Sequence, residues 1–280
     1  MSTTAPATSS VWQRAFKQKR LVVGLGITVL VVLFAVLGPL LTPHGQNDVV
    51  GTPFSKDGLL GTDYLGQDVL SRLMHGGTTI LLISLFGTIL GMAGGIAIGV
   101  VAAYAGGWWD EVIMRLNDVT LAFPQILLAL LVLTAVNQPR AWMIVILIGV
   151  SHAPRVARLA RGVALGIVSR DFVYAAEALG EKRSRVIFAE VLPNMNAPLL
   201  AEAGLRLTYS IGLVAALGFL GFSTDPGAAN WGQMINENRL AMSTQAWGVL
   251  APVLVIGLFT IGTNLMADGI AQLAQRGGED

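Results

Sequence analysis

The residues that most often do chemistry are few in this chain, and their spacing does not suit catalysis. His44, His75 and His152 are its only histidines, and none belongs to a paired motif that holds a metal ion. Ser151 and His152 are neighbours on a predicted helix and so do not face each other as nucleophile and base. No GxxxxGK[ST] phosphate loop is present. We expect no enzymatic site, metal or cofactor in this chain, and we expect the histidines to lie at membrane interfaces.

Four polar residues within one apolar run are candidates for a different role. Glu202 and Arg206 are one helical turn apart and therefore share a helix face. Ionisable groups are costly in lipid. The two residues form either a structural ion pair, which we favour, or a gate in a cavity. Tyr209 and Ser210 follow them as candidate pathway contacts.

Composition indicates a membrane protein. Hydrophobic residues make up 54% of the 280 residues and charged residues only 12%, whereas soluble domains are nearer a quarter charged. A bilayer crossing needs about 20 apolar residues, which must be helical to pair their backbone groups. The sequence therefore predicts an all-α integral membrane protein with six transmembrane helices. These are Leu21–Leu41, Ile80–Tyr104, Val119–Val136, Ala141–Val156, Leu199–Phe222 and Trp247–Ala267.

Charge placement predicts the topology. Most Lys and Arg residues fall in segments that share one side if both termini are cytoplasmic, as the positive-inside rule requires. Residues 1–20 and 268–280 are then cytoplasmic tails, and residues 42–79 form a periplasmic segment. Met1–Ser10 are expected to be disordered. Because the basic residues already have this topological explanation, we expect no nucleic-acid partner.

Two features are expected around the second span. Thr62 or Asp63 can cap a short helix that starts near Tyr64. Glycine recurs at every fourth position of the span, which forms a ridge that another helix can approach closely. The sequence leaves open whether that helix belongs to this chain or to another subunit. The ridge consists of Gly87, Gly91, Gly95 and Gly99.

The third span is expected to follow a cytoplasmic turn at Ala105–Asn117. Within that turn, Glu111 and Arg115 are spaced for an ion pair. Pro124 lies inside the span and predicts a kink, because proline lacks the N–H that an interior helix position needs.

The segment Asp171–Asn194, DFVYAAEALGEKRSRVIFAEVLPN, is a charged, helix-forming insertion between apolar runs. Ser169 is the expected N-cap, and Asp171 places negative charge in the first turn, where the helix dipole favours it. Small alanines followed by Gly180 describe a helix tip that fits a groove of another protein. The alternative is a helical hairpin that lies on the membrane surface.

Four stretches together resemble the C-type permease subunit of dipeptide, oligopeptide and nickel ABC importers. LLGTDYLGQDVLSRL precedes the second span, and AFPQILLALLV (Ala122–Val132) begins the third. Asp171–Asn194 is similar to the loop that docks on the ATPase. GFLGF (Gly218–Phe222) and NWGQMINENR (Asn230–Arg239) end the fifth span and follow it.

The resemblance implies a type I ABC importer permease fold with a core of five helices over residues 80–267. It also implies a cytoplasmic coupling helix within residues 157–198. Family members often have Glu where this chain has Tyr174, and Arg where it has Gln67. The coupling residues implied are Tyr174, Ala175, Ala176, Glu177, Ala178, Leu179, Gly180, Leu192 and Pro193.

The resemblance further implies partners. A homologous B-type permease would complete the pathway, two ABC ATPase subunits would bind ATP and Mg²⁺, and an extracytoplasmic binding protein would deliver short peptides. Transport would proceed by alternating access across a prokaryotic inner membrane. A nickel or metal–chelator importer, and more remotely an ion-coupled secondary transporter, are the alternatives.

Overall fold

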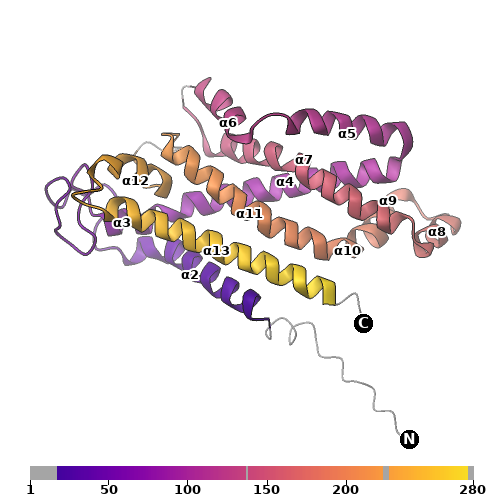
Figure 1. Ribbon diagram of the computed structural model, residues 1–280, viewed down its shortest axis with the longest axis horizontal. Coiled ribbons are helices and arrows are strands. Elements are labelled where there is room, and N and C mark those ends of the chain that lie inside the picture. The colour runs from indigo at the N-terminus through magenta and orange to yellow at the C-terminus, as the bar shows by residue number, and fades with distance from the viewer. Residues whose placement is uncertain (1–17, 137, 223–226, 277–280) are drawn as a thin grey trace, which may run out of the picture.

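The computed structural model describes residues 18–136, 138–222 and 227–276, and within these it is a long helical bundle without a β-sheet (Figure 1). The predicted disordered tail Met1–Ser10 lies outside the described residues. The helices are α2 (Lys19–Leu41), α3 (Val69–His75), α4 (Gly77–Ala105), α5 (Gly107–Leu121), α6 (Gln125–Thr134), α7 (Ala141–Val168), α8 (Asp171–Ala178), α9 (Arg183–Arg185), α10 (Leu192–Asn194), α11 (Asn196–Phe219), α12 (Trp231–Asn238) and α13 (Trp247–Arg276), with a π-helical turn η1 (Val186–Val191) and a 3₁₀ turn η2 (Arg239–Ala241).

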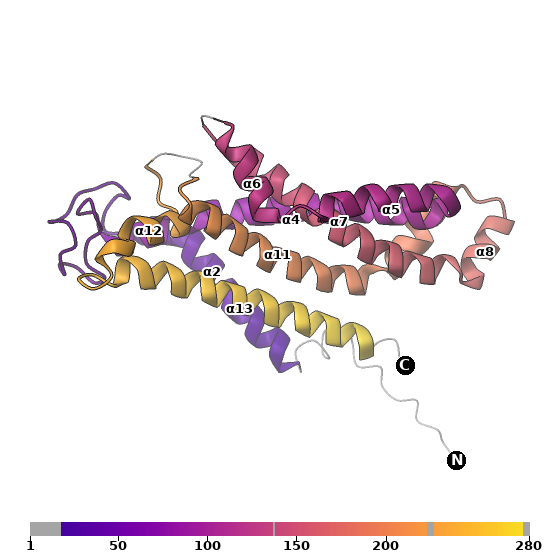
Figure 2. The ribbon, with the colours of Figure 1, turned by 45° about the horizontal axis from the view of Figure 1, so that its top comes forward.

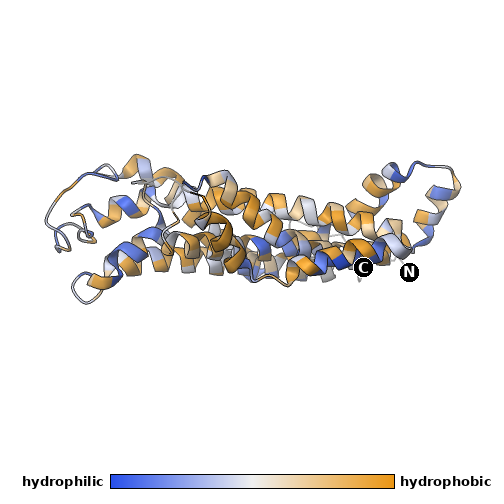
Figure 3. Cartoon of the chain, turned by 90° about the horizontal axis from the view of Figure 1, so that it is seen from above, coloured by the Kyte–Doolittle hydropathy of each residue, from blue (hydrophilic) through white to orange (hydrophobic). Residues whose placement is uncertain are grey.

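Several helices are long and apolar enough to span a membrane. Five stretches of the described chain qualify, and a bent pair, α5 with α6, makes a sixth if it counts as one span. Apolar residues cover the long helices, and polar residues gather toward the two ends of the bundle (Figure 3). The prediction of an all-helical membrane protein is confirmed. The five stretches are Lys19–Leu41, Val69–Ala105, Ala141–Val168, Asn196–Phe219 and Trp247–Leu273.

The glycine ridge of α4 lies against α7 of the same chain. A Cβ atom at Gly87 would lie 2.6 Å from Ile148 Cγ2, and one at Gly95 would lie 2.4 Å from Val156 Cβ. These distances are shorter than real contacts, so the absence of a side chain lets the two helices pack at their observed separation. Gly91 and Gly99 are equally close to α7.

The bundle has two ends. α3, α12 and the loops near them lie at one end, and α8 lies at the other (Figures 1 and 2). α2 packs along α13, where a Cβ at Gly24 would lie 2.5 Å from the Met266 backbone nitrogen. α11 lies between α13 and the α4–α7 pair.

The predicted start of the first short helix near Tyr64 is wrong. α3 begins at Val69, and the Asp68 side chain caps it by accepting the backbone N–H three residues further on. Asp63 caps no helix, because its carboxylate accepts the N–H groups two and four residues ahead in a turn. Gly66 has φ of +78° in that turn, a conformation that prevents a right-handed helix from forming there.

The third span differs from the prediction. The turn expected at Ala105–Asn117 is mostly helical, since α5 begins at Gly107. Where Val119–Val136 was expected to be one kinked helix, α5 and α6 meet at a bend of 73°. Pro124 directly precedes α6, and proline disfavours helix both at its own N–H and at the residue before it. The expected Glu111–Arg115 ion pair is present at 2.6 Å.

The fourth span is longer than predicted. α7 continues through Pro154 and past the expected end at Val156 to Val168. The Pro154 carbonyl accepts a buried hydrogen bond from Asn117 Nδ2 of α5 at 2.9 Å. Proline is tolerated inside membrane helices where neighbouring helices satisfy the disturbed backbone.

Candidate functional site

The coupling segment, defined here as Asp171–Asn194, forms a helical hairpin at the far end of the bundle (Figure 2). Val173 anchors α8 because its side chain is buried among apolar residues of α7 and η1. Tyr174 is 58% exposed and Leu179 is 85% exposed. An apolar side chain as exposed as Leu179 at a helix tip suits contact with another protein.

Gly180 reverses the chain after α8. Its φ is +80°, and a Cβ placed there would meet nothing within 4 Å. Glycine is therefore needed for the backbone conformation and not for internal packing. The surface around Gly180 is open to a partner. Ser169, the expected N-cap of α8, is the C-terminal cap of α7, and Arg170 occupies the N-cap position.

The second half of the coupling segment returns to the bundle through α9, η1 and α10. Val186 and Val191 are buried, and Pro193 lies inside α10, just before α11 begins. The tip of the hairpin is also tied to α4, because the Tyr104 hydroxyl donates to the Glu177 carboxylate. The hairpin is thus continuous with both α7 and α11.

The candidate pathway residues separate onto two faces of α11. Arg206 Nε donates to Glu202 at 2.6 Å, and both side chains are largely buried. Tyr209 is 59% exposed, with the Arg206 guanidinium 5.1 Å from its ring centroid. Ser210 is completely buried. Tyr209 therefore faces an open surface in this structure, and Ser210 packs helices together.

Ser210 belongs to a polar cluster that joins α4, α7 and α11. Its hydroxyl is 2.8 Å from Thr88 Oγ1 and 2.9 Å from His152 Nε2. His152 is fully buried, so its expected interfacial position is wrong. The close approach of α4 and α7 at the glycine ridge brings the imidazole into the core, since a Cβ at Gly91 would lie 2.7 Å from the Cβ of His152.

The sequence did not predict a buried charge network at the α3/α12 end. Arg72 pairs with Asp63 and, at 3.0 Å, with Glu237 of α12. Tyr64 donates its hydroxyl to Glu237 at 3.4 Å. Burial and the Glu237 carboxylate raise the pKa of Tyr64 above its usual value, so the phenol stays protonated and acts as a donor. Glu237 is 165 residues from Arg72, and no local pattern reveals a pairing at that separation.

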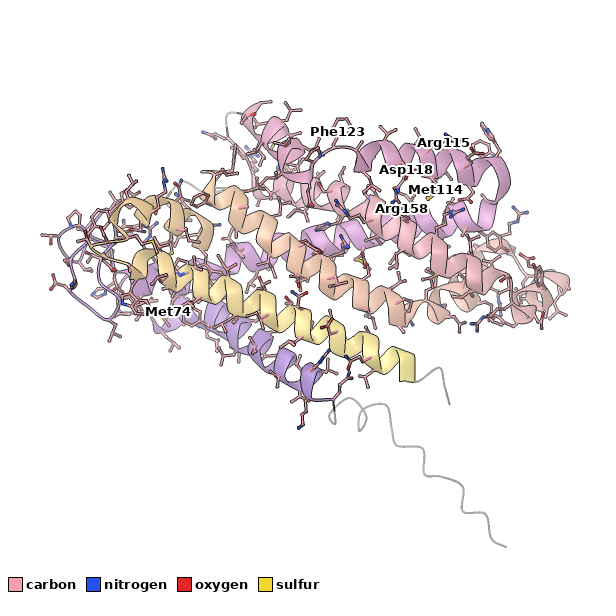
Figure 4. The ribbon with its side chains drawn as sticks, in the orientation of Figure 1. Met74, Met114, Arg115, Asp118, Phe123 and Arg158 are labelled. Carbon is pink, nitrogen blue, oxygen red and sulfur yellow. The ribbon has the colours of Figure 1, made fainter. Side chains whose placement is uncertain are left out.

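Ion pairs also join α5 to α7. Asp118 and Arg158 point toward each other from the two helices at 2.6 Å, and Arg115 lies farther from α7 (Figure 4). Asp110, about two helical turns before Asp118 on α5, pairs with Arg161, about one turn after Arg158 on α7. These pairs explain how α7 accommodates charged residues beyond its predicted end. Within the described ranges, no three His, Asp or Glu side chains lie close enough to hold a metal ion.

Comparisons with known proteins agree with this architecture. Residues 95–277 match the family described as binding-protein-dependent transport system inner membrane component, and residues 8–57 match the N-terminal TM domain of oligopeptide transport permease C. The dipeptide transport system permease protein DppC of Alkalihalophilus pseudofirmus is 34% identical, over 93% of this chain and 88% of the relative.

Further relatives and a solved structure extend the match. The di/tripeptide transport system permease protein DppC of Pseudomonas aeruginosa is 36% identical, over 92% of this chain and 88% of its own length. A chain of the MetNI methionine ABC transporter, in an inward-facing conformation, has the same fold. Its TM-score is 0.50 at 18% identity, and the match covers 72% of this chain and 94% of that one. The chain described here therefore belongs to the binding-protein-dependent transport system inner membrane components, the multi-pass permeases of bacterial ABC importers.

Proposed function

We propose that this chain is one permease subunit of an ATP-driven importer of short peptides. The names of its relatives support the substrate class, since those at 34% and 36% identity are dipeptide and di/tripeptide permeases. The chain pairs with a homologous B-type permease to enclose the pathway. Two ABC ATPase subunits and an extracytoplasmic binding protein complete the assembly.

The coupling segment is the observation on which this proposal rests. Its tip combines exposed apolar side chains with a positive-φ glycine, and it lies at the end of the bundle opposite α12. A helix tip of this kind can seat in a groove of an ATPase subunit and move with it. Its continuity with α7 and α11 gives that movement a direct route to the helices that pack along the core.

We assign no catalysis to this chain. The ATPase subunits bind ATP with Mg²⁺ and hydrolyse the ATP, and this chain contributes the pathway and the coupling contact. The glycine-rich stretch of α4 packs against α7 and so is unavailable to cradle phosphate. Alternating access then consists of rigid movements of helix groups, as in other transporters with a central pathway.

The proposal is tested at Gly180 in the purified complex, reconstituted with its binding protein. We expect Gly180→Trp to abolish dipeptide uptake and peptide-stimulated ATP hydrolysis, because a bulky side chain at the tip blocks seating. Gly180→Asn is the control for backbone strain, since Asn tolerates positive φ, and it should retain most activity. Gly26→Trp, on an open face of α2, controls for bulk.

Unchanged uptake and ATP hydrolysis in Gly180→Trp would overturn the coupling role. Uptake driven by an ion gradient in the chain purified alone would establish the secondary-transporter alternative. Copurification with a binding protein that holds nickel or a metal chelate, in place of a peptide, would correct the substrate class.

A further inference from the structure

A cavity of about 680 Å³ opens between the start of α6, the middle of α11 and the middle of α13. The break before α6 leaves room for it, because α6 turns away from the line of α5 by 73° (Figure 2). The cavity is lined by Gln125, Ile126, Thr208, Tyr209, Gly212, Leu213, Ala216, Thr260 and Asn264.

The position of the polar lining residues along their helices indicates whether the cavity faces lipid or water. Tyr209 lies near the middle of α11 and Thr260 near the middle of α13, so both are far from either end of their helices. Asn264 lies one helical turn further toward the C-terminal end of α13. Hydrogen-bonding groups that face lipid at this depth have no partner and cost free energy. The exposed Tyr209 side chain is therefore better explained by a water-containing pathway than by lipid.

The polar groups that line the cavity are neutral. None of its lining residues is ionisable at neutral pH, because Tyr209 is a phenol and the others are amides, hydroxyls or apolar groups. The Thr208 hydroxyl already has a hydrogen-bond partner, since it is 2.8 Å from the Thr263 hydroxyl. Gln125 lines the cavity, but its Nε2 atom is buried and so does not face the open space. Tyr209 and Asn264 are left as the polar side chains near the middle of the cavity wall that can meet a solute.

Charged residues lie near the cavity but do not line it. Arg206, one turn before Tyr209, pairs with Glu202, and its guanidinium lies 5.1 Å from the Tyr209 ring centroid. Gln125 and Ile126 are the first residues of α6, and the first-turn N–H groups of a helix have no acceptor within it. The cavity therefore offers amide and hydroxyl partners for the N–H and C=O groups of an amide-containing solute.

We propose that Tyr209 and Asn264 form a contact site for the peptide backbone in the translocation pathway. Amide and hydroxyl side chains complement the N–H and C=O groups shared by all short peptides. We therefore expect this site to select little between peptides that differ in their side chains. The inference rests on the proposed function and adds to it the residues that meet the substrate within the membrane.

Single cysteines test this placement, because the natural chain contains none. Tyr209→Cys and Asn264→Cys are introduced separately into the whole importer, and their reaction with a charged, water-soluble thiol reagent is measured. We expect both to react, and we expect the dipeptide Ala-Ala, with ATP and the binding protein present, to slow the reaction. Ser210→Cys, on the buried face of α11, should stay unreactive.

Leu30→Cys is the control for lipid exposure. Leu30 is exposed on α2 but lies within an apolar helix, and a charged reagent does not reach thiols in lipid. If Tyr209→Cys and Asn264→Cys are as unreactive as Leu30→Cys in every nucleotide state, a partner or lipid covers the cavity and the proposal fails. Intact peptide uptake by the wild-type importer would show that the proposed function survives this failure.

Conservative variants supply the functional measurement. Tyr209→Phe and Asn264→Leu each remove hydrogen-bonding capacity while largely keeping volume, and we expect each to lower kcat/KM for Ala-Ala uptake roughly 2- to 10-fold, the usual value of one neutral hydrogen bond. ATP hydrolysis without peptide should not change. Unchanged kcat/KM in both variants would contradict contact with the substrate.

Discussion

At the residue scale, Arg72 is a buried cation held by two carboxylates, one nine residues before it and one on the distant helix α12. Its side chain is 4% exposed and contacts Asp63 from the preceding turn and Glu237 from α12. Taking such charges out of water costs several kcal/mol, which the pairing offsets only while every partner is present. The network therefore joins the segment before α3 to α12 and makes their contact depend on one residue.

We expect Arg72→Met to destabilise the protein by about 3–5 kcal/mol, because it leaves two carboxylates buried without a cation. Glu237→Gln should cost less, since Arg72 keeps Asp63 as its partner. Thermal unfolding of the detergent-solubilised complex measures both effects. Arg115→Met, which removes a pair with exposed side chains, should leave the melting temperature unchanged. Equal melting temperatures for Arg72→Met and Arg115→Met would contradict the account of this network.

At the element scale, the glycines of α4 set the distance to α7. A Cβ at Gly95 would lie 2.4 Å from Val156 Cβ and 2.6 Å from the Ala153 carbonyl oxygen, whereas one at the adjacent Gly94 would lie 3.7 Å from its nearest neighbour. We expect Gly95→Leu to lower stability by about 1–3 kcal/mol or to prevent assembly, as overpacking does. Gly94→Leu should be tolerated, and thermal unfolding of the complex compares the two. If Gly94→Leu is equally harmful, the ridge does not determine the packing.

The helices also show which elements a sequence can predict. The four-residue spacing of the glycines is a local signal, and the sequence predicts the close packing that it produces. Pro124 predicts a disturbance of the third span, but as a kink in one helix, whereas the structure has a break of 73° between two helices. The N-terminus of α3 was not predicted, because the side chain of Asp63 is used in a turn and in the Arg72 network. The continuation of α7 past Val156 was also missed, since ion pairs with α5 stabilise its charged turns. The pathway candidates could be placed on one helix but not sorted by face, and so Ser210 was paired with Tyr209.

At the scale of the whole molecule, the two ends of the bundle make different contacts. The α8 end presents the coupling segment, and the α3/α12 end presents the turns around the Arg72 network (Figure 1). The start of α2 and the end of α13 lie side by side, with Gln18 Nε2 donating to Gln272 at 2.8 Å. If the coupling segment meets cytoplasmic ATPases, the α3/α12 end must face the binding protein on the opposite side of the membrane.

This orientation predicts that two equally exposed positions are labelled from opposite sides of the membrane. Leu59, near the α3/α12 end, is 84% exposed, and Leu179, at the tip of the coupling segment, is 85% exposed, so intrinsic accessibility does not separate them. In cells whose outer surface is open to a membrane-impermeant thiol reagent, we expect Leu59→Cys to be labelled and Leu179→Cys to be protected. In inside-out vesicles that lack the ATPase subunits the pattern should reverse, and restoring those subunits should again protect Leu179→Cys. Labelling of Leu179→Cys from outside would place the coupling segment on the side away from the cytoplasmic ATPases and would overturn its coupling role.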